Sequence, residues 1–470
     1  MYKLLLIAKY LRRKLAPMFA ALAVTLCTAM VIIVISVMGG FLDLLRTSAQ
    51  QLTGDVLVTA GSLTGFAHYE DVLDAVRDLD EVAAATPVLR AYGLINLHDR
   101  TLPVEIEGIR PHELDQVVGY RDTLYWTNDE LVDAGMRLAP PAAWLGDPAT
   151  AADADAPAET GIVIGIEVNP FHTRDEEGRY SRFNSVVGSE LTLTTVPLTQ
   201  QGAFQEPAYR QLAIVNEFKS GLYEVDANRV YVPFDMLQRM LRLHERQQRV
   251  DADAWGEGGR LITTPGRTTD IVVNGAPGYP LHEVRDAVER ATARTMARHD
   301  VILTPFVITW EQRHGQLLAA VQNEKGLVTF LFIIISVVAI VMVATTFYMI
   351  VLEKTRDIGV LRAIGASRRG IMHIFLGYGL AIGVVGSLVG LGLAYAIVTR
   401  LNEIQAFIDT TFGWRMWDPQ TYFFDRIPDR VDPVEAGAIV LGAIVSSVIG
   451  ALIPAWLASR QNPIEALRYE

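Results

Sequence analysis

Residues 326–352 read GLVTFLFIIISVVAIVMVATTFYMIVL, a run without one charged side chain. This run exceeds the roughly 20 residues that an α-helix needs to cross a bilayer. Three further uncharged runs of comparable length occur, at Leu15–Leu42, Gly370–Thr399 and Ala436–Ser459. The sequence therefore predicts an α-helical membrane protein with four transmembrane helices, one near the start of the chain and three towards its end.

The 43–325 segment between the first two spans has a different composition. The chain is 50% hydrophobic and 20% charged, so its apolar residues must be segregated into the spans, while this segment is long enough for a folded domain with its own core. Short strand-like and helix-like patterns alternate along it. We expect a large α+β domain outside the cytoplasm, inserted between helices 1 and 2 in a 1+3 arrangement.

Local patterns divide this domain into two α+β lobes. The first lobe is expected to hold strands at Gly54–Gly61, Ala91–His98 and Pro103–Ile109, and a helix at His68–Leu79. The second is expected to hold everything from Gly161 onward, and its segments are strands at Gly161–Val168, Glu190–Val196, Arg210–Phe218, Arg229–Pro233, Asp270–Asn274 and Val301–Ile308, and helices at Phe234–Leu243 and Leu281–Arg298.

Between the lobes, residues 146–160 (GDPATAADADAPAET) are rich in Ala, Asp and Pro and show no apolar period. We expect a flexible surface insert. Asp153 and Asp155 suggest a cation site only weakly, because no glycine turn or bidentate glutamate follows at the calcium-loop spacing. A solvated acidic loop is the simpler interpretation.

The distribution of basic residues predicts the orientation. Residues 1–14 and the loop 353–369 are rich in Lys and Arg, whereas the loop 400–435 carries more acidic than basic residues. Since basic loops stay in the cytoplasm, the N-terminal segment, the 353–369 loop and the 460–470 tail are predicted to be cytoplasmic. The 400–435 loop and the large domain are predicted to be periplasmic, in a multi-pass protein of the cell inner membrane.

Familiar catalytic signatures are missing from the sequence. The formal charge of −12 argues against a nucleic-acid partner. The nine histidines show no zinc-type spacing, and the single cysteine, Cys27, lies inside the first span and is expected to be a packing residue. Neither a phosphate-binding loop nor a nucleophile elbow occurs. We therefore expect a non-catalytic subunit that binds no metal or cofactor itself.

The 353–369 loop, EKTRDIGVLRAIGASRR, has the pattern of a short surface helix. Ile358, Leu361 and Ile364 fall three apart and form one apolar stripe, so the helix is expected to lie along the membrane surface. Gly365 is placed to end this helix, and Ser367 is placed to cap the next one. From charge alone, a plain basic interfacial loop is an equally good interpretation.

Two Gly-x-x-x-Gly spacings occur in the third span, at Gly379/Gly383 and Gly386/Gly390. Small residues four apart let another helix approach closely. Packing within the bundle is the favoured use, with contact between two permease subunits as the alternative.

The loop resembles a known coupling segment. The run Lys354–Ser367, KTRDIGVLRAIGAS, is similar to the coupling segment of FtsX-like ABC transporter permeases of the MacB type. Within that family, likeness to the lipoprotein-releasing (Lol-type) permeases extends along nearly the whole chain. The motifs that carry it are Ile7–Arg13, Ser36–Phe41, Phe218–Asp226, Val230–Pro233, Trp310–Gln312, Asp418–Asp425 and Pro454–Glu470.

The resemblance implies roles for particular residues. Those expected to contact a partner ATPase are Arg356, Asp357, Ile358, Gly359, Leu361, Arg362, Ala363, Gly365 and Ala366. Met38, Phe41, Glu324 and Lys325 are candidates for the substrate side, with Glu324 and Lys325 otherwise serving as interfacial anchors.

The resemblance also implies partners. They are two copies of a cytoplasmic ABC ATPase that holds ATP and Mg²⁺, a second permease, identical or paralogous, membrane lipids, and a lipoprotein with a periplasmic acceptor. The implied function is ATP-driven extraction of lipoproteins from the outer leaflet of the inner membrane. The alternative is a mechanotransmission permease that drives an efflux partner or regulates a cell-wall hydrolase. A tethered receptor or enzyme without a motor would have no use for a coupling segment.

Overall fold

The computed structural model describes residues 15–98, 100–126, 161–173, 180–181, 184–199, 201–250, 260–299, 301, 304–413, 427 and 430–461. The chain divides into two compact units. A helical unit is drawn from Met1–Leu44, Gln316–Trp417 and Arg426–Glu470, and a sheet unit from Leu45–Gly315 and Asp418–Asp425. The predicted N-terminal segment 1–14, the insert 146–160, the Asp418–Asp425 motif and most of the 460–470 tail lie outside the described residues.

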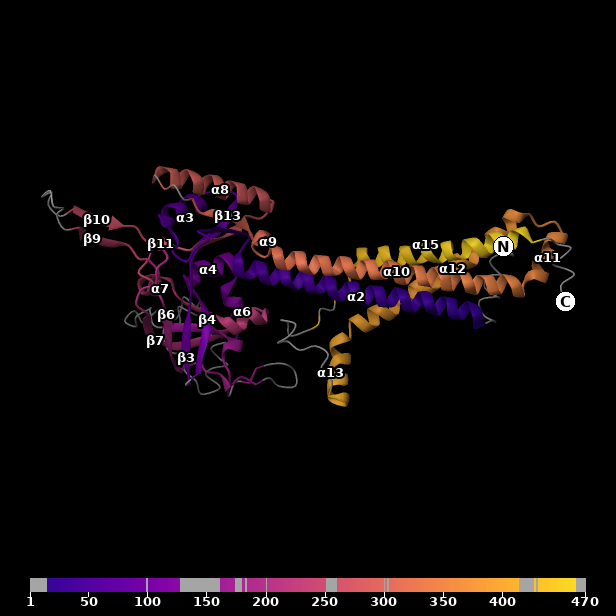
Figure 1. Cartoon of the computed structure of the whole chain (residues 1–470), viewed down its shortest axis with the longest axis horizontal. Helices are drawn as coiled ribbons and strands as arrows, with labels where there is room; N and C mark the ends of the chain where they lie inside the picture. Colours follow the sequence, from indigo (N-terminus) through magenta and orange to yellow (C-terminus); the bar gives the residue numbers. More distant parts are fainter. Residues whose placement is uncertain are drawn as a thin grey trace. The chain divides into compact units, whose positions relative to one another are not determined.

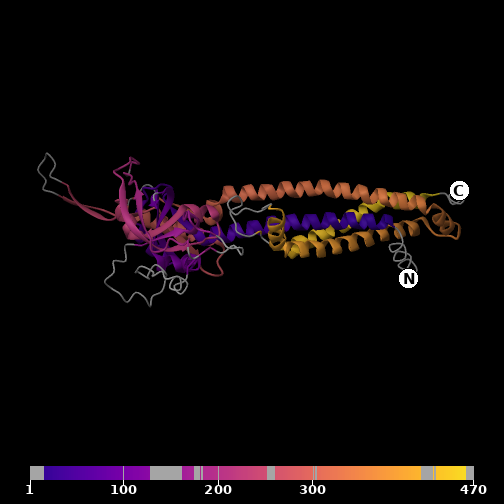
Figure 2. The same ribbon diagram turned by 90° about the horizontal axis from the view of Figure 1, so that it is seen from below.

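Four long helices make up most of the helical unit and run alongside one another (Figures 1 and 2). They are α2 (Leu15–Thr53), α10 (Gly315–Glu353), α12 (Arg368–Val398) and α15 (Pro433–Arg460). Each contains a stretch long and apolar enough to cross a membrane, at Met18–Ser48, Leu318–Glu353, Arg368–Val398 and Pro433–Arg460. The four predicted apolar helices are therefore present where the uncharged runs indicated.

Two of these helices extend well beyond their uncharged runs. The predicted spans stopped at Leu42 and began at Gly326, whereas α2 continues to Thr53 and α10 starts at Gly315. A charged residue interrupts a hydropathy pattern without breaking backbone hydrogen bonding, because Glu, Gln, Lys and Arg are good helix formers. Hydropathy alone therefore underestimated both helices.

Two short helices connect the long ones. Helix α11 (Thr355–Ala363) joins α10 to α12, and α13 (Leu401–Phe412) follows α12 and ends at Gly413, whose φ of 64° is left-handed. Such a glycine is the usual end of a helix. The sequence reasoning predicted the first of these helices and missed the second.

The sheet unit is built on a nine-stranded sheet in the order β13-β1-β12-β3-β4-β8-β5-β7-β6. The bounds of these strands in chain order are β1 Val56–Thr59, β3 Val82–Leu97, β4 Arg100–Ile109, β5 Gly161–Gly165, β6 Glu190–Thr195, β7 Ala208–Phe218, β8 Arg229–Pro233, β12 Asp270–Gly275 and β13 Phe306–Thr309. Two small pairs complete the sheets, namely β2 (Phe66–Ala67) with β11 (Arg267–Thr268) and β9 (Arg246–Val250) with β10 (Arg260–Thr264).

Strand β3 organises this unit because it is long enough to take part in two arrangements. Its first part pairs with β12, which extends the sheet through β1 to β13. Its second part pairs with β4 on one side and, over Gly93–Asn96, with β6 on the other. Since β4, β8, β5, β7 and β6 are joined in sequence, these pairings close a six-stranded ring.

The division into lobes by chain order is therefore corrected. Strands β12 and β13 were expected in the second lobe, but they pair with β1, the first strand of the chain. Strand β4 was expected in the first lobe, but it pairs in parallel with β8 of the ring. Non-local pairing of this kind leaves no periodic signal in a sequence, which explains the error.

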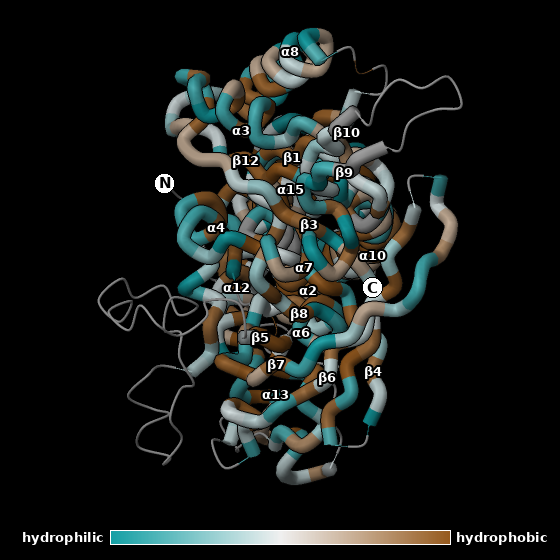
Figure 3. The backbone as a smooth tube through the Cα atoms, turned by 90° about the vertical axis from the view of Figure 1, so that its left-hand side faces the viewer, coloured by the Kyte–Doolittle hydropathy of each residue, from teal (hydrophilic) through white to brown (hydrophobic). Residues whose placement is uncertain are grey.

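Helices pack on the open part of the sheet. Helix α3 (Tyr69–Arg77) lies beside α8 (Leu281–Arg298), and the buried faces of both contribute to one hydrophobic core (Figure 1). Helices α4 (Pro111–Val118), α6 (Tyr223–Asn228) and α7 (Phe234–Met240) are shorter. Strand β5 is hydrophobic along its length (Figure 3), and all five of its residues are buried. Alternation is absent there because both faces of the strand are covered.

Candidate functional site

The predicted coupling segment forms helix α11, which lies where α10 turns back into α12 (Figure 1). Ile358 is 3% exposed and packs in the apolar core of the bundle, together with residues such as Val351 and Ile371. Leu361 is 38% and Ile364 81% exposed. The expected single apolar stripe is therefore wrong, because only its first member faces the bundle.

Arg362 ties this helix to the end of α15. Its Nη1 atom donates to the carbonyl oxygen of Gln461 over 2.6 Å and lies 3.4 Å from that of Ser459. The last carbonyls of a helix have no partner within the helix, and a cationic side chain satisfies them favourably. Arg362 thus positions α11 within this protein, and Gly359, which is also buried, is not on its outer surface.

The turn after α11 follows the predicted capping pattern. Gly365 has a φ of 104°, in the region that favours glycine, and the helix ends just before it. The Ser367 hydroxyl accepts a hydrogen bond from the Gly370 N–H over 3.1 Å and so caps α12. Both predictions are confirmed.

The outer surface of α11 combines charge with exposed apolar side chains. Its exposed members are Arg356, Asp357, Val360, Leu361, Ala363 and Ile364, followed by Gly365, with Ala366 half-buried. Asp357 accepts from the Lys354 Nζ over 2.8 Å. A surface with apolar groups at its centre and charges around them is typical of protein interfaces.

The glycines of α12 pack against two different helices. A Cβ added at Gly379 would lie 2.5 Å from the Ala451 Cβ of α15, and the Ser447 hydroxyl of α15 donates to the Gly379 carbonyl over 2.8 Å. At Gly386, an added Cβ would lie 2.9 Å from the Val24 Cβ of α2.

Both pairs are used in the same way along their length. Gly383 faces Ser447 and Ile444 of α15, while Gly390 faces Thr25 and Thr28 of α2. The predicted use of both glycine pairs for packing within the bundle is confirmed, and the two pairs serve separate contacts.

An apolar cavity of about 420 Å³ lies inside the bundle between α2, α10 and α15. Val31 of α2, Phe332 and Val337 of α10, and Gly442 and Ser446 of α15 are among its lining residues. Pockets that bind small molecules are typically about 300–1,000 Å³. A hydrocarbon chain is the chemistry that such a lining accommodates.

The four substrate-side candidates lie away from this cavity. Met38 and Phe41 are half-buried and Glu324 is exposed, and none of the three lines the cavity. The Lys325 Nζ lies 2.6 Å from the Glu435 Oε1 of α15, so this lysine joins α10 to α15. Hydropathy could not identify the cavity residues, because they look like the rest of each span.

In the sheet unit, a buried charge cluster joins four strands. Arg229 of β8 pairs with Glu105 and Glu107 of β4, with Nη2–Oε2 and Nη1–Oε1 distances of 2.9 and 3.3 Å. Arg90 of β3 contacts Glu105 and, at 3.7 Å, Asp270 of β12. Burial raises the pKa of Glu107, an effect that the two arginines oppose. Removing either partner of such a pair is strongly destabilising.

The family-like motif Phe218–Asp226 forms the connection from β7 to α6. The Asp226 carboxylate is 3% exposed and accepts from the Ser220 N–H and hydroxyl, both over 2.7 Å. Burial raises the pKa of Asp226 to about 6. A Cβ at Gly165 would lie 2.1 Å from the Asp226 carbonyl oxygen, so this motif packs directly on β5.

An exposed apolar groove of about 310 Å³ lies beside the second part of β3. Leu94 is 45% exposed, and Tyr92 and Phe204 are more exposed still. Contiguous apolar surface of this kind on a folded domain marks a site of interaction. No sequence signal identified it, because the residues come from three separate segments.

Comparison with known proteins agrees with these features. The model of the MacB-like periplasmic core domain family matches residues 18–291, and that of the FtsX-like permease C-terminal family matches residues 329–463.

Individual relatives cover nearly the whole chain. The lipoprotein-releasing system transmembrane protein LolC of Neisseria meningitidis serogroup B is 24% identical over 460 residues, which is 96% of this chain and 94% of that protein. LolC of Xylella fastidiosa is also 24% identical, over 456 residues and the same shares. The transmembrane protein LolE of Haemophilus influenzae is 25% identical over 162 residues, 34% of this chain and 39% of that protein.

Among solved structures, the periplasmic region of MacB from Actinobacillus actinomycetemcomitans covers 56% of this chain and 91% of its own, with 8% identity and a TM-score of 0.30. That score is too low to carry an argument. The family assignment rests on the two family models, which together account for most of the chain. The chain belongs to the FtsX-like, MacB-type ABC transporter permeases and is similar to the lipoprotein-releasing permeases among them.

Proposed function

We propose that this chain is the permease subunit of an ABC transporter that extracts lipoproteins from the outer leaflet of the inner membrane and passes them to an acceptor. The observation that carries the proposal is the apolar cavity between α2, α10 and α15. It offers a hydrocarbon-lined site inside a membrane-spanning bundle, where the acyl chains of a lipoprotein reside before release. Similarity to LolC over nearly the whole chain supports the same function.

Extraction of a lipid anchor requires external work. Each CH₂ group moved out of the bilayer costs about 0.8 kcal/mol. An anchor with two or three acyl chains therefore does not leave spontaneously. In this proposal the work comes from ATP hydrolysis, with ATP and Mg²⁺ held by a separate cytoplasmic ATPase.

The outer surface of α11 is the proposed contact with that ATPase. Ile358 and Arg362 fix the helix to the bundle, so force applied to its exposed side would be transmitted to α10, α12 and α15. A rigid attachment is what a lever needs. Two ATPase copies would serve two permeases, this chain and an identical or paralogous one.

Helix α10 offers the surface for the second permease. Only 11% of its span is buried inside the described chain, against 39% for the spans of α2 and α12. A helix that lines the cavity and presents most of its surface outward is suited to contact a neighbouring subunit as well as lipid. Disulfide crosslinking between cysteines placed on α10 of two permeases would test this contact, and absence of any crosslink would contradict it.

We propose an orientation with both ends of the chain in the cytoplasm and the sheet unit in the periplasm. The basic residues of segments 1–14 and 353–369 support it. The apolar groove at Leu94 is then available to receive a lipoprotein or to contact its acceptor. Labelling of single introduced cysteines by a membrane-impermeant reagent tests the orientation, and labelling of residue 356 from the periplasm would contradict it.

The function is tested by reconstituting the chain with its ATPase and second permease in vesicles that carry a lipoprotein. We expect ATP-dependent transfer of the lipoprotein to a soluble acceptor. ATP hydrolysis without any transfer would contradict lipoprotein release. That outcome would favour the alternative, a mechanotransmission permease that acts on an efflux partner or a cell-wall hydrolase.

A further inference from the structure

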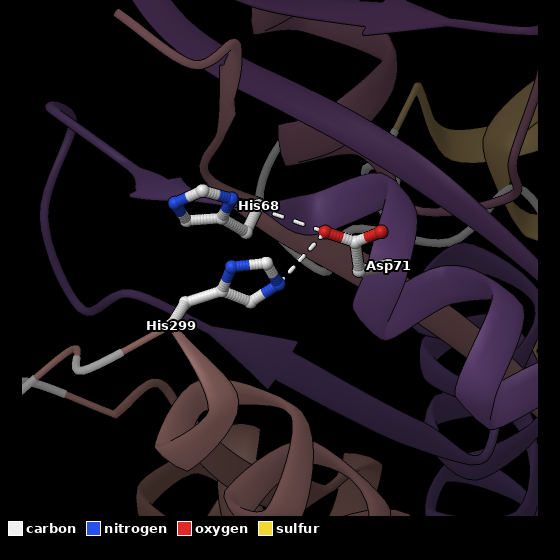
Figure 4. A group of neighbouring side chains, drawn as sticks. All are labelled: His68, Asp71 and His299. Atoms are coloured by element: carbon white, nitrogen blue, oxygen red, sulfur yellow. Dashed lines mark ion pairs between the residues drawn. The ribbon is translucent and has the colours of Figure 1, made fainter.

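Two histidines and one aspartate far apart in the chain meet in the sheet unit (Figure 4). His68 precedes α3, Asp71 lies in the first turn of α3, and His299 follows the last residue of α8. The pairing of α3 with α8 brings the two ends together. None of the local spacings that identify metal sites in a sequence is present, which explains why the sequence predicted no metal.

The donor atoms converge on one point. The Asp71 Oδ2 lies 2.9 Å from the His299 Nε2 and 3.9 Å from the His68 Nδ1, and all three donor atoms lie within 4.8 Å of one another. Zinc bonds to nitrogen and oxygen measure about 2.0–2.2 Å, so tetrahedral ligand atoms stand roughly 3.3–3.5 Å apart. Small side-chain rotations bring the observed set to that geometry.

Both histidines are held in place by the backbone around them. His68 has a φ of 58°, a left-handed conformation that histidine adopts more readily than most residues. His299 follows α8, whose face of Val284, Val288 and Met296 is buried in the same core as Val72 and Val76 of α3. The helix packing therefore fixes the separation of the two rings before any ion binds.

The two imidazole rings stack in parallel. Their centroids are 3.9 Å apart and their planes differ by 11°. Two protonated rings at this distance would repel each other. Partial burial and the neighbouring His299 lower the pKa of His68, which Asp71 opposes. Neutral imidazole is the form that binds a metal.

The site is also accessible. The side chains of His68 and His299 are 29% and 31% exposed, and that of Asp71 is 56% exposed. An ion can therefore enter from solvent, and a water molecule can complete its coordination. Imidazole with one carboxylate favours zinc and neighbouring transition metals over Mg²⁺ or Ca²⁺, which prefer oxygen ligands.

We propose that His68, Asp71 and His299 bind one divalent transition-metal ion of the zinc type. The ion would tie the start of α3 to the end of α8, directly before the chain continues into β13 and α10. Bound metal would thus hold the sheet unit at the segment that leads into the second span. This inference does not rest on the proposed transport function.

The test uses the full chain in detergent micelles, purified through a tag that contains no histidine. Zn²⁺ binding is measured by competition with a chromophoric chelator, and Co²⁺ binding by visible absorption. We expect one ion per chain, a higher melting temperature with Zn²⁺ than with EDTA, and no competition by Mg²⁺. Loss of an outer-shell partner commonly weakens metal binding by about 10- to 100-fold. His68→Asn, Asp71→Asn and His299→Ala remove direct ligands and should each cost at least as much.

Matched controls lie on the same two helices. His282→Ala on α8 and Asp74→Asn on α3 remove exposed residues of the same types outside the cluster and should leave Zn²⁺ affinity unchanged. Asparagine fits the left-handed conformation of residue 68, so His68→Asn should keep the metal-free melting temperature. Absence of Zn²⁺ binding by the wild-type chain, or equal affinity in the three cluster variants, would overturn the proposal.

Discussion

Asp226 is a carboxyl group whose titration is set by its surroundings. It lies in a buried turn and accepts two hydrogen bonds from Ser220, yet burial outweighs them and raises its pKa to about 6 from an ordinary value of 3.8. Because the folded protein holds this proton more tightly than the unfolded chain, the carboxyl group favours folding below about pH 4. That contribution is lost as the pH rises through about 6.

Replacing Asp226 by Asn should therefore change the pH dependence of stability. Asn resembles the protonated acid and keeps an acceptor for Ser220, so the variant is expected to gain up to about 3 kcal/mol relative to wild type between pH 4 and pH 7. The measurement is thermal unfolding of the full chain at both pH values. A difference between the two proteins that does not vary with pH would contradict the raised pKa.

At this scale the sequence gives residue types more readily than roles. The Phe218–Asp226 motif stood out by resemblance, but its buried aspartate depends on Gly165, a residue of a strand far away in the chain. His68 and His299 appeared as isolated histidines for the same reason. A role created by contact between distant segments leaves no local pattern.

Helix α11 shows where local patterns succeed and where they fail. Its capping residues, Gly365 and Ser367, were predicted correctly, because a helix end is fixed by its immediate neighbours. The facing of Leu361 and Ile364 was predicted wrongly, because it depends on the positions of α10, α12 and α15. The structure accordingly separates residues that anchor the helix from residues that are available to a partner.

This separation predicts two kinds of coupling variant. Leu361→Asp and Ile364→Asp change exposed side chains, so the bundle should fold normally while co-purification with the ATPase is lost. Ile358→Asp places a charge in the apolar core and should prevent folding. The measurements are ATPase co-purification and melting temperature. Normal ATPase binding by both exposed-residue variants would show that this surface of α11 is not the contact.

Close packing of α12 predicts a position-specific cost for larger side chains. Gly379→Val introduces a side chain into contact with Ala451 and should destabilise the bundle by about 1–3 kcal/mol. Gly392→Val is the matched control on the same helix, because no atom lies within 4 Å of a Cβ added there. Equal melting temperatures for the two variants in detergent would contradict the packing described for Gly379.

For the whole molecule, the four apolar helices and the presence of an α+β domain between the first two followed from composition and period. The grouping of strands within that domain did not, because β3 is shared and the last strands return to the first. The cavity between α2, α10 and α15 was equally invisible, since its lining is chemically the same as the lipid-facing surface of each helix. Architecture was predictable wherever one segment decides it, and sites were not, because several segments build them.

The central claim is that acyl chains enter this cavity during ATP-driven release, and a pair of glycines on α15 tests it directly. Gly442 lines the cavity and Gly437 does not, and an added Cβ meets nothing within 4 Å at either position. The measurement is the rate of ATP-dependent lipoprotein release from reconstituted vesicles by Gly442→Phe and Gly437→Phe, with ATP hydrolysis followed in parallel. We predict that Gly442→Phe loses most of its release while ATP hydrolysis continues, and that Gly437→Phe behaves as wild type; equal release by the two variants would contradict the claim.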